Sequence, residues 1–278
     1  CNSFCTYCII PYARGRVRSM PLEAAVEETK KLAQEGYREI VIHGIEISSW
    51  GWEWKNGSCL RQLLAALCAA VPAVRIRLGS LEPRTIDEDF CKTLSGFENL
   101  CPQFHLSLQS GSDTVLKRMN RKYDTARYLE SVRLLHKHFP NCAVTTDLIV
   151  GFPGETEQEF SDSLSFMQTC RLAAVHVFPY SRRKGTPAAS MPDQIEKSEK
   201  ERRAALAGEV AAELHQTFLT QQIGTEHDVL FEQTENGYFT GHTMNYVKVY
   251  CDAADLRNEI RRVRVTSLFE DGVLAELV

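Results

Sequence analysis

The stretch AVTTDLIVGFPGETEQEFSDSLSFMQTC, residues 143–170, contains the strand–turn–helix pattern from which the fold class can be predicted. Its first nine residues form an apolar, β-branched run of the length typical of a buried parallel strand. A tight turn, GFPGE, leads into an amphipathic segment with helical spacing. A strand that passes through a short turn into a helix is the repeating unit of a parallel α/β sheet.

The same unit recurs on both sides of this stretch. Further strand candidates are EIVIHG (39–44), VRIRLGS (74–80), FHLSLQS (104–110) and AAVHVFPY (173–180). Helical patterns lie between them; the one over 21–36 begins at Pro21 and ends on Gly36, and Ser112 and Asp124 are expected N-caps. This alternation predicts an α/β fold with a parallel sheet, either open or curved into a barrel, with reactive residues at the carboxyl ends of the strands.

The pattern changes in the last third of the chain. Residues 193–222 are charged, rich in Ala and free of strand signals, which predicts a connecting helix. After Gly224, short alternating strands follow with turns at Asn236-Gly237 and Asp271-Gly272, a pattern typical of a small antiparallel barrel. We therefore expect three parts: an α/β core over 1–192, a connecting helix over 193–221 and an all-β barrel over 222–278.

Composition bounds the class of protein. Of the 278 residues, 44% are hydrophobic and 24% charged, as in ordinary globular proteins. No apolar run approaches the ~20 residues of a membrane helix, and no signal peptide is recognisable. We expect a cytoplasmic protein without a membrane partner. The net charge of −4 provides no overall attraction to nucleic acid.

The ten cysteines are unevenly distributed. Cys1, Cys5 and Cys8 form the spacing C-x3-C-x2-C, whereas the other seven are scattered. Three thiolates in one short loop can hold three corners of an iron–sulfur cube and leave the fourth iron open. The alternatives are a zinc site and structural thiols. Zinc usually takes four ligands, and the nearest further candidate is His43.

The string CNSFCTYCIIPYARG resembles the cluster loop of radical S-adenosylmethionine (SAM) methylthiotransferases, including the aromatic Tyr7 before the third cysteine. The segments GIEIS (44–48), GSLEP (79–83), HLSLQSGSDTVLKRMNRKY (105–123), TDLIVGFPGETEQEF (146–160) and FPYSRRKGTPA (178–188) extend the resemblance over almost the whole chain. It implies a partial TIM-like barrel, a [4Fe–4S] cluster on Cys1, Cys5 and Cys8 as the catalytic centre, and SAM bound to the open iron. An electron passed into that SAM would give a 5′-deoxyadenosyl radical. The final barrel resembles the TRAM domain, an RNA-binding module.

PYARGRVRS, YSRRKGTPA and NYVKVY look most like the MtaB-like branch. That branch converts threonylcarbamoyladenosine, next to the anticodon in tRNA, to its 2-methylthio derivative. Sister branches act on isopentenyladenosine in tRNA or on an aspartate of a ribosomal protein. Two other classes stay open: a radical SAM enzyme acting on a small molecule, and a zinc-stabilised RNA-binding protein.

The resemblance also implies partners and a missing part. Family members carry an N-terminal domain whose second [4Fe–4S] cluster, on three further cysteines, supplies the sulfur. The chain starts inside the cysteine motif, so we read it as a fragment that lacks this domain. We expect tRNA as substrate, a reducing partner such as flavodoxin or ferredoxin, and a monomer.

Several residues at strand ends are expected to contact the cofactor. Glu46 could bond the SAM ammonium or simply face solvent. Ser80 and Glu82 could contact SAM or substrate, or form a turn. Gln109, with Ser110, precedes Gly111, where backbone can approach a ligand closely.

Four further positions carry the same expectation, together with Tyr7. Asp147 lies in an apolar strand, where a charge is costly unless it is bound or paired. The backbone of Gly151, Pro153 and Gly154 can pass beside the SAM adenosine. Arg121 could pair with the SAM carboxylate, and a surface ion pair is the alternative.

Other residues are candidates for RNA contact. Trp50, Trp52 and Trp54 could stack on bases or pack as a loop. Arg14, Arg16 and Arg18 follow the cysteine loop and could meet phosphates or form a solvated face. The region 222–278 has five Lys or Arg against ten Asp or Glu, a balance of −5, so any phosphate contact there needs a local face. Its candidates are Arg257, Arg261, Arg262 and Arg264.

Overall fold

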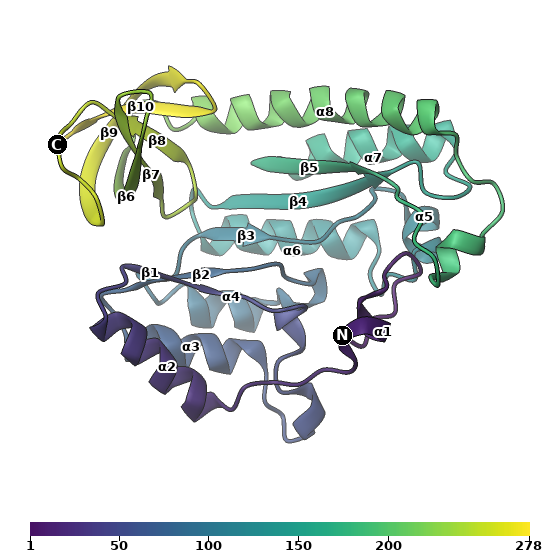
Figure 1. Ribbon diagram of the computed structural model, residues 1–278, viewed down its shortest axis with the longest axis horizontal. Helices are drawn as coiled ribbons and strands as arrows, with labels where there is room; N and C mark the ends of the chain where they lie inside the picture. Colours follow the sequence, from purple (N-terminus) through teal and green to yellow (C-terminus); the bar gives the residue numbers. More distant parts are fainter.

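The computed structural model describes residues 1–278, and its larger part is a parallel sheet with helices outside it (Figure 1). The strands are β1 (Glu39–Ile42), β2 (Arg75–Leu78), β3 (Gln103–His105), β4 (Ala143–Val150) and β5 (Ala174–Pro179). β1 pairs with β2, and β3, β4 and β5 pair in that order, all parallel. Parallel bridges from Ile76 to Leu100 and from Leu81 to Leu106 join the two groups. The predicted α/β class is confirmed.

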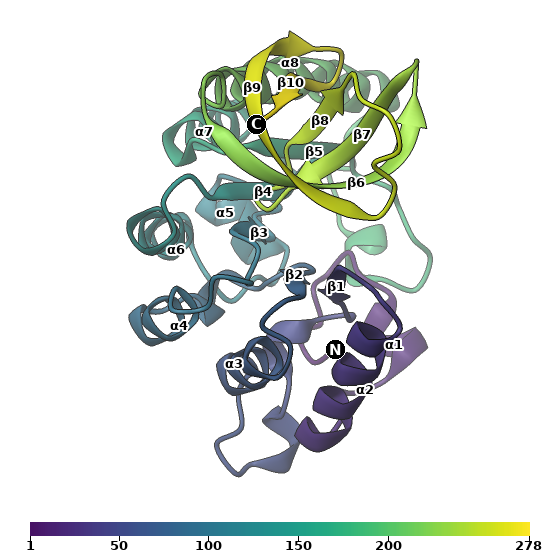
Figure 2. The ribbon, with the colours of Figure 1, turned by 90° about the vertical axis from the view of Figure 1, so that its left-hand side faces the viewer.

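Apart from α1 (Ile10–Arg14), which follows the cysteine loop, the helices before α8 (Lys197–Thr220) lie along the outside of this sheet (Figure 1). They are α2 (Leu22–Gln34), α3 (Leu60–Ala70), α4 (Glu88–Leu94), α5 (Asp113–Arg118), α6 (Thr125–His138) and α7 (Glu157–Cys170), with short 3-10 turns η1 (Ile47–Ser49), η2 (Trp52–Trp54), η3 (Pro83–Thr85) and η4 (Pro187–Ser190). Figure 2 shows the strands as an open arc with α3, α4, α6 and α7 along its outer side. The sheet is therefore a partial barrel, and the ladders are shorter than the predicted strands because the ends turn into loops.

Helix caps explain where some of these helices begin. The Asp124 carboxylate accepts the Arg127 N–H at 2.8 Å, as predicted for an N-cap. Thr156 and Glu159 form a capping box at the start of α7. Ser112 occupies the N-cap position of α5, as predicted, but its hydroxyl pairs with the Thr114 hydroxyl and makes no capping bond to the backbone.

The C-terminal strands close into a barrel of order β10-β8-β7-β6-β9. They are β6 (Glu226–Glu235), β7 (Tyr238–Thr243), β8 (Lys248–Cys251), β9 (Glu259–Phe269) and β10 (Gly272–Leu277). Asn236 and Gly237 both have positive φ, as their turn requires. Two details differ from expectation: β10 pairs with β8 in parallel, so the barrel is not wholly antiparallel, and the last turn is Glu270-Asp271.

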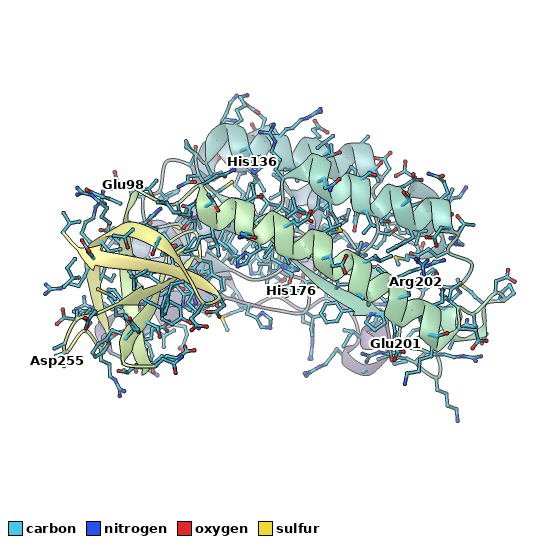
Figure 3. All side chains as sticks on the ribbon, turned by 90° about the horizontal axis from the view of Figure 1, so that it is seen from above. Glu98, His136, His176, Glu201, Arg202 and Asp255 are labelled. Carbon is cyan, nitrogen blue, oxygen red and sulfur yellow. The ribbon has the colours of Figure 1, made fainter.

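Helix α8 (Lys197–Thr220) connects the two parts. It lies over β5 and runs to the barrel (Figure 1). Ala207 and Ala211 belong to the core of the sheet and its helices, and Leu219 belongs to the separate core of the barrel. Figure 3 shows this course from above, with Arg202 toward the end of α8 far from the barrel and Asp255 on the outer rim of the barrel. None of the helices combines the length and apolarity needed to cross a membrane.

Two buried arginines of β2 fix the barrel against the sheet. Arg75 donates to the carbonyl oxygens of His242 and Asp228, at 3.2 and 2.7 Å. Arg77 donates to the Met244 carbonyl at 2.9 Å and forms a bidentate pair with Glu39 at 2.6 and 2.9 Å. Its guanidinium also lies over the Tyr246 ring. This joint is made at the amino ends of the strands, away from their carboxyl ends.

Candidate active site

The loop that carries Cys1, Cys5 and Cys8 is held by backbone contacts to residues that follow α5. The Thr6 N–H donates to the Met119 carbonyl at 3.0 Å, and the Asn120 amide donates to the Phe4 carbonyl at 2.9 Å. From the other side, the Ala188 N–H donates to the Thr6 carbonyl at 2.9 Å. All ten cysteines of the chain are free thiols. The loop is thus fixed on both sides of its second cysteine, at Phe4 and at Thr6.

Arg121 lies against the buried Cys5. Its Nη1 donates to the Cys5 Sγ at 3.3 Å, and its Nε donates to the Tyr123 hydroxyl at 3.0 Å. Burial alone would lower the pKa of Arg121, but Tyr123, Tyr7 and Cys5 outweigh it and the pKa is raised. The guanidinium therefore stays charged beside the thiol. The alternative of a surface ion pair was wrong, because Arg121 has no carboxylate partner.

Glu46 lies against Cys1. The Cys1 thiol is 3.8 Å from the Glu46 Oε2, which also accepts the Ser3 hydroxyl at 3.4 Å. Burial raises the pKa of Glu46, and the nearby carboxylate of Glu82 raises it further. The carboxylate is half-buried rather than solvent-facing. A carboxylate with little competing solvent can bind an ammonium group strongly.

A cavity of about 410 Å³ begins at Cys8 and crosses the ends of β4 and β5. Its lining includes Tyr7, Cys8, Gln109, Asp147, Phe178 and Arg183. Gln109 has a positive φ of 69°, although it is not a glycine. Its backbone is held on both sides by β4, donating to the Asp147 carbonyl and accepting from the Ile149 N–H, both at 2.9 Å. Such a fixed, unfavourable backbone is often found at functional sites.

Asp147 is paired inside the arc of strands. Its Oδ2 is 3.4 Å from the Nε2 of His105 on β3, although the angle does not make a hydrogen bond. The His105 ring stacks on His176 of β5 with centroids 6.2 Å apart. Asp147 thus lies beside His105, and its carboxylate lines the cavity; its role in the site stays a prediction.

A second cavity, of about 550 Å³, lies on the other side of the cysteine loop. Cys1 and Glu46 line it, together with Arg14, Arg16 and Arg18 and the exposed edge of β1. Arg16 also lies over the Phe4 ring at 4.8 Å. The loop therefore separates two cavities, with Cys1 facing one and Cys8 facing the other.

The Radical SAM superfamily model matches residues 1–167, more than half of the chain, including all three clustered cysteines. This chain belongs to the radical SAM superfamily. Enzymes of that superfamily use a [4Fe–4S] cluster and SAM, so the radical SAM chain is an enzyme with these cofactors.

Curated proteins similar to this chain are named for two different tRNA-modifying reactions. Threonylcarbamoyladenosine tRNA methylthiotransferase MtaB of Bacillus subtilis is 38% identical over 95% of this chain and 60% of its own length. tRNA-2-methylthio-N(6)-dimethylallyladenosine synthase of Acetivibrio thermocellus is 37% identical over 96% of this chain and 57% of its own. The chain thus spans about 60% of the length of such relatives.

Solved radical SAM structures share the fold at low sequence identity. Coproporphyrinogen III oxidase (HemN) of Escherichia coli has a TM-score of 0.55 and 13% identity, covering 95% of this chain and 62% of its own. The radical SAM methyltransferase TsrM of Kitasatospora setae has a TM-score of 0.57 and 17% identity, covering 68% and 37%. These likenesses support the partial barrel.

The residues present fit the cofactors of the radical SAM family. Cys5 accepts a hydrogen bond from the Arg121 guanidinium, and all three clustered cysteines are free thiols. Nowhere do three or more His, Cys, Asp or Glu side chains lie close enough together to hold a single metal ion. A zinc ion would need such a compact set, whereas an iron–sulfur cube takes one thiolate at each of three separate irons. Cys1, Cys5 and Cys8 would hold the cluster, with Glu46 and Arg121 beside it.

The remaining cofactor candidates do not line the cavity that begins at Cys8. Gly151 and Gly154 have positive φ, and Pro153 between them is buried. A methyl group on Gly151 would meet Lys200 of α8 at 2.2 Å, so this glycine is packed against α8. Ser80 follows β2 and is exposed. Their contact with SAM stays a prediction.

Two other expectations can be compared with their surroundings. A methyl group on Gly111 would fall 2.7 Å from the Ser163 Cα, so Gly111 serves close packing on α7 and not the approach of a ligand. Trp50 is buried and donates to the Met20 carbonyl at 2.9 Å, while its ring meets Trp54 edge-on. Trp52 is exposed. The tryptophan segment is thus mainly a packed loop.

The arginines of the barrel are paired with acids. Arg264 contacts Glu226 at 2.7 Å, and Arg262 contacts both Glu226 and Asp228. Arg261 contacts Glu259 at 3.3 Å. These exposed pairs reduce the positive charge that the face could offer to phosphate.

Proposed function

We propose that this radical SAM chain is the catalytic core of a tRNA methylthiotransferase that converts N6-threonylcarbamoyladenosine, next to the anticodon, to its 2-methylthio derivative. The observation that carries the proposal is the cysteine loop between two cavities, with Cys5 held by Arg121 and Cys1 by Glu46. Relatives at similar identity, named for this reaction or for the sister reaction on dimethylallyladenosine, support the reaction type.

The residues have distinct roles in this proposal. When bound, the cluster supplies an electron that cleaves SAM to a 5′-deoxyadenosyl radical. Glu46 binds the SAM ammonium, and Arg121 lies where it can bind the carboxylate while it donates to Cys5. Tyr7, Gln109 and Asp147 line the cavity next to Cys8 and orient what enters it.

Polar groups in the Cys8 cavity favour threonylcarbamoyladenosine over its sister substrate. The threonylcarbamoyl group carries a carboxylate and a hydroxyl, whereas the dimethylallyl group is apolar. Arg183, Ser181, Gln109 and Asp147 all line this cavity. A guanidinium matches the geometry of a carboxylate, so Arg183 is the proposed contact for the threonyl carboxylate.

Sulfur insertion needs a donor other than the SAM-binding cluster. The seven remaining cysteines are scattered through the fold, and six of them are buried. We propose that the donor is a second [4Fe–4S] cluster in a segment beyond these 278 residues, as in the methylthiotransferase pattern.

The C-terminal barrel is proposed to be a TRAM-like RNA-binding module. In this division, residues 1–192 are the radical SAM core, 193–221 the connecting helix and 222–278 the barrel. A flavodoxin or ferredoxin is the proposed electron donor, and the protein is proposed to act as a cytoplasmic monomer.

The test begins with the full-length protein, reconstituted anaerobically with iron and sulfide. We expect a reduced cluster whose EPR signal shifts on addition of SAM, and 2-methylthio-threonylcarbamoyladenosine in nucleosides from treated tRNA. Product on dimethylallyladenosine instead would assign the sister branch. A cluster indifferent to SAM would reject the proposal, and SAM cleavage without modified tRNA would point to a small-molecule substrate.

A further inference from the structure

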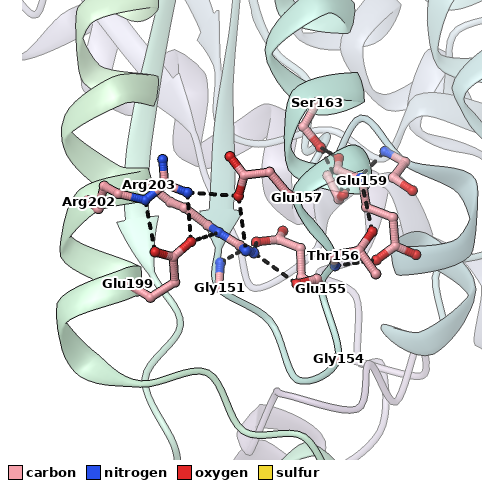
Figure 4. A network of polar contacts seen from close by, with 12 residues as sticks. Gly151, Gly154, Glu155, Thr156, Glu157, Glu159, Ser163, Glu199, Arg202 and Arg203 are labelled. Atoms are coloured by element: carbon pink, nitrogen blue, oxygen red, sulfur yellow. Dashed lines mark hydrogen bonds and ion pairs between the residues drawn. The ribbon is translucent and has the colours of Figure 1, made fainter.

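The turn between β4 and α7 is closed by a buried carboxylate. Glu155 is 3% exposed, and its Oε2 accepts the N–H of Gly151 at 2.6 Å (Figure 4). The pKa of Glu155 is raised, mainly by burial, and is restrained by the hydrogen bonds it accepts. Without a partner, a charge in this position would be costly. The turn therefore depends on what neutralises Glu155.

Arg203 of α8 supplies that partner. It is 5% exposed, and its Nη1 donates to both the carboxylate and the carbonyl of Glu155, at 2.8 and 2.9 Å. Its Nε donates to Glu199 at 2.7 Å (Figure 4). Its guanidinium also lies near the Phe160 ring. Arg203 thus supplies the hydrogen bonds that tie α8 to Glu155, while Lys200 of α8 packs against Gly151 of the same turn.

The opposite side of the same turn faces the cysteine loop. Phe152, inside the turn, is fully buried. Its ring meets Tyr7 edge-on at 6.3 Å and Tyr180 at 5.4 Å. Tyr7 lies between Cys5 and Cys8, and both tyrosines line the cavity that begins at Cys8. Movement of the turn would therefore move two walls of that cavity.

We infer that Arg203 is a positioning residue for the cavity that begins at Cys8: its ion pair with Glu155 holds the Gly151–Glu155 turn, and the turn holds Phe152 against Tyr7 and Tyr180. This inference rests on the proposed function. A buried ion pair by itself adds little stability compared with apolar packing. Here the carboxylate also satisfies a buried backbone N–H, so the pair fixes a conformation that apolar side chains could not.

The neighbouring residue provides a matched control. Arg202 is the same residue type on the same helix, and it also pairs with Glu199 and Glu157, at 2.8 and 2.7 Å. It is exposed and makes no contact with Glu155. Arg202→Met therefore removes one charge and two surface pairs without touching the turn.

The experiment compares Arg203→Met, Arg202→Met and the parent as full-length protein, reconstituted with iron and sulfide. We expect Arg203→Met to keep the iron content of the parent but to bind SAM about tenfold more weakly, as is typical when a supporting residue is lost. Without cofactors, amide hydrogen exchange should speed up at Gly151–Glu155 in Arg203→Met only. Unchanged SAM affinity and unchanged exchange in Arg203→Met would overturn the inference.

A double variant separates positioning from general damage. In Glu155→Gln with Arg203→Met, the buried charge is gone, while the amide oxygen can still accept the Gly151 N–H. We expect its SAM affinity to return to within about threefold of the parent. A double variant that regains its melting temperature but not its SAM affinity would contradict the role of the turn. A parent without a SAM-shifted EPR signal would reject the proposed function itself, and the inference with it.

Discussion

The Nη1 of Arg121 lies 3.3 Å from the Sγ of Cys5, so a permanent positive charge donates directly to the middle cysteine of the motif. Arg121 is 116 residues away in sequence, and it reaches Cys5 because the segment after α5 carries the cysteine loop through Thr6 and Asn120. A donor and a positive charge at a cluster sulfur both favour the reduced state of an iron–sulfur centre.

Arg121→Met should therefore lower the reduction potential of the reconstituted cluster. We expect a shift on the order of 50 mV, because a one-electron potential changes by ~59 mV for each tenfold change in the equilibrium constant. An EPR-monitored redox titration measures it. Lys122→Met, next in sequence and exposed, is the control and should leave the potential unchanged. An equal shift in both variants would mean that overall charge, not the hydrogen bond, sets the potential.

Replacing single cysteines should separate ligands from packing residues. Cys1→Ala, Cys5→Ala and Cys8→Ala should each lose most of the bound iron after reconstitution, since an open loop with two thiolates holds a cube poorly. Cys59→Ser should retain it, because Cys59 caps α3 and serine is a good N-cap. The iron and sulfide content of each reconstituted variant is the measurement. A Cys5→Ala variant with the iron content of the parent would exclude Cys5 as a cluster ligand.

Glu46→Gln should have opposite effects on stability and on SAM binding. The pKa of Glu46 is raised by burial and by Glu82, so between the usual and the raised pKa the folded chain binds more protons than the unfolded chain. The contribution of Glu46 to stability therefore falls as pH rises through that window. The glutamine variant should melt higher than the parent above the window and equally below it. It should bind SAM at least about tenfold more weakly, as expected for the loss of a charged hydrogen bond. Melting curves across pH and calorimetry test both; a variant less stable at neutral pH would contradict the first expectation.

Arg77→Met should weaken the whole chain by breaking a buried pair. It would leave Glu39 without its bidentate partner and remove the bond to the Met244 carbonyl. The expected loss in unfolding free energy is about 3–5 kcal/mol, measured by urea denaturation. Adding Glu39→Gln should restore part of it. Arg61→Met, which removes only a 3.9 Å exposed pair with Asp89, should change stability by less than about 0.5 kcal/mol. Equal losses of stability in Arg77→Met and Arg61→Met would argue against a special role of the Arg77 contacts between the sheet and the barrel.

The two arginine groups should differ in their contribution to tRNA affinity. Arg14, Arg16 and Arg18 are exposed and have no carboxylate partners, whereas Arg261, Arg262 and Arg264 are paired with acids. Replacing the first three by Gln should reduce the slope of log affinity against log salt by about one for each lost phosphate contact. The same change in the barrel should alter the slope by less. Filter binding of tRNA at several salt concentrations measures both, and the reverse order would assign the phosphate contacts to the barrel.

The sequence was most informative for features that depend on residues close together in the chain. Strand–helix alternation predicted all five parallel strands, and the C-x3-C-x2-C spacing with its flanking residues led to the superfamily that the comparisons confirm. Asp124 could be predicted as a cap because a cap depends on residues within one turn. The assignments of Ser80 and of Gly151 to the cofactor remain predictions.

Partnerships between distant segments could not be predicted. Arg203 is 48 residues from Glu155, and Arg75 is 153 residues from Asp228. Nothing local determines such contacts, although the arginines within the strand VRIRLGS were a sign, since charge in a buried strand requires a partner. The expectation that the backbone at Gly111 approaches a ligand failed for the same reason. Gly111 packs closely against Ser163 of α7, which lies 52 residues farther along the chain.

Under the proposed function, helix α8 has a consequence for which nucleotide is modified. Its Arg203 pairs with Glu155 in the turn, and Leu219, 16 residues farther along, belongs to the core of the barrel, so the two anchor points are roughly 24 Å apart. A helix anchored at both ends acts as a spacer of fixed length. The helix would then fix the distance between an RNA stem bound to the barrel and the cysteine loop. The position of the target adenosine would depend on the length of this helix as well as on the sequence of the RNA.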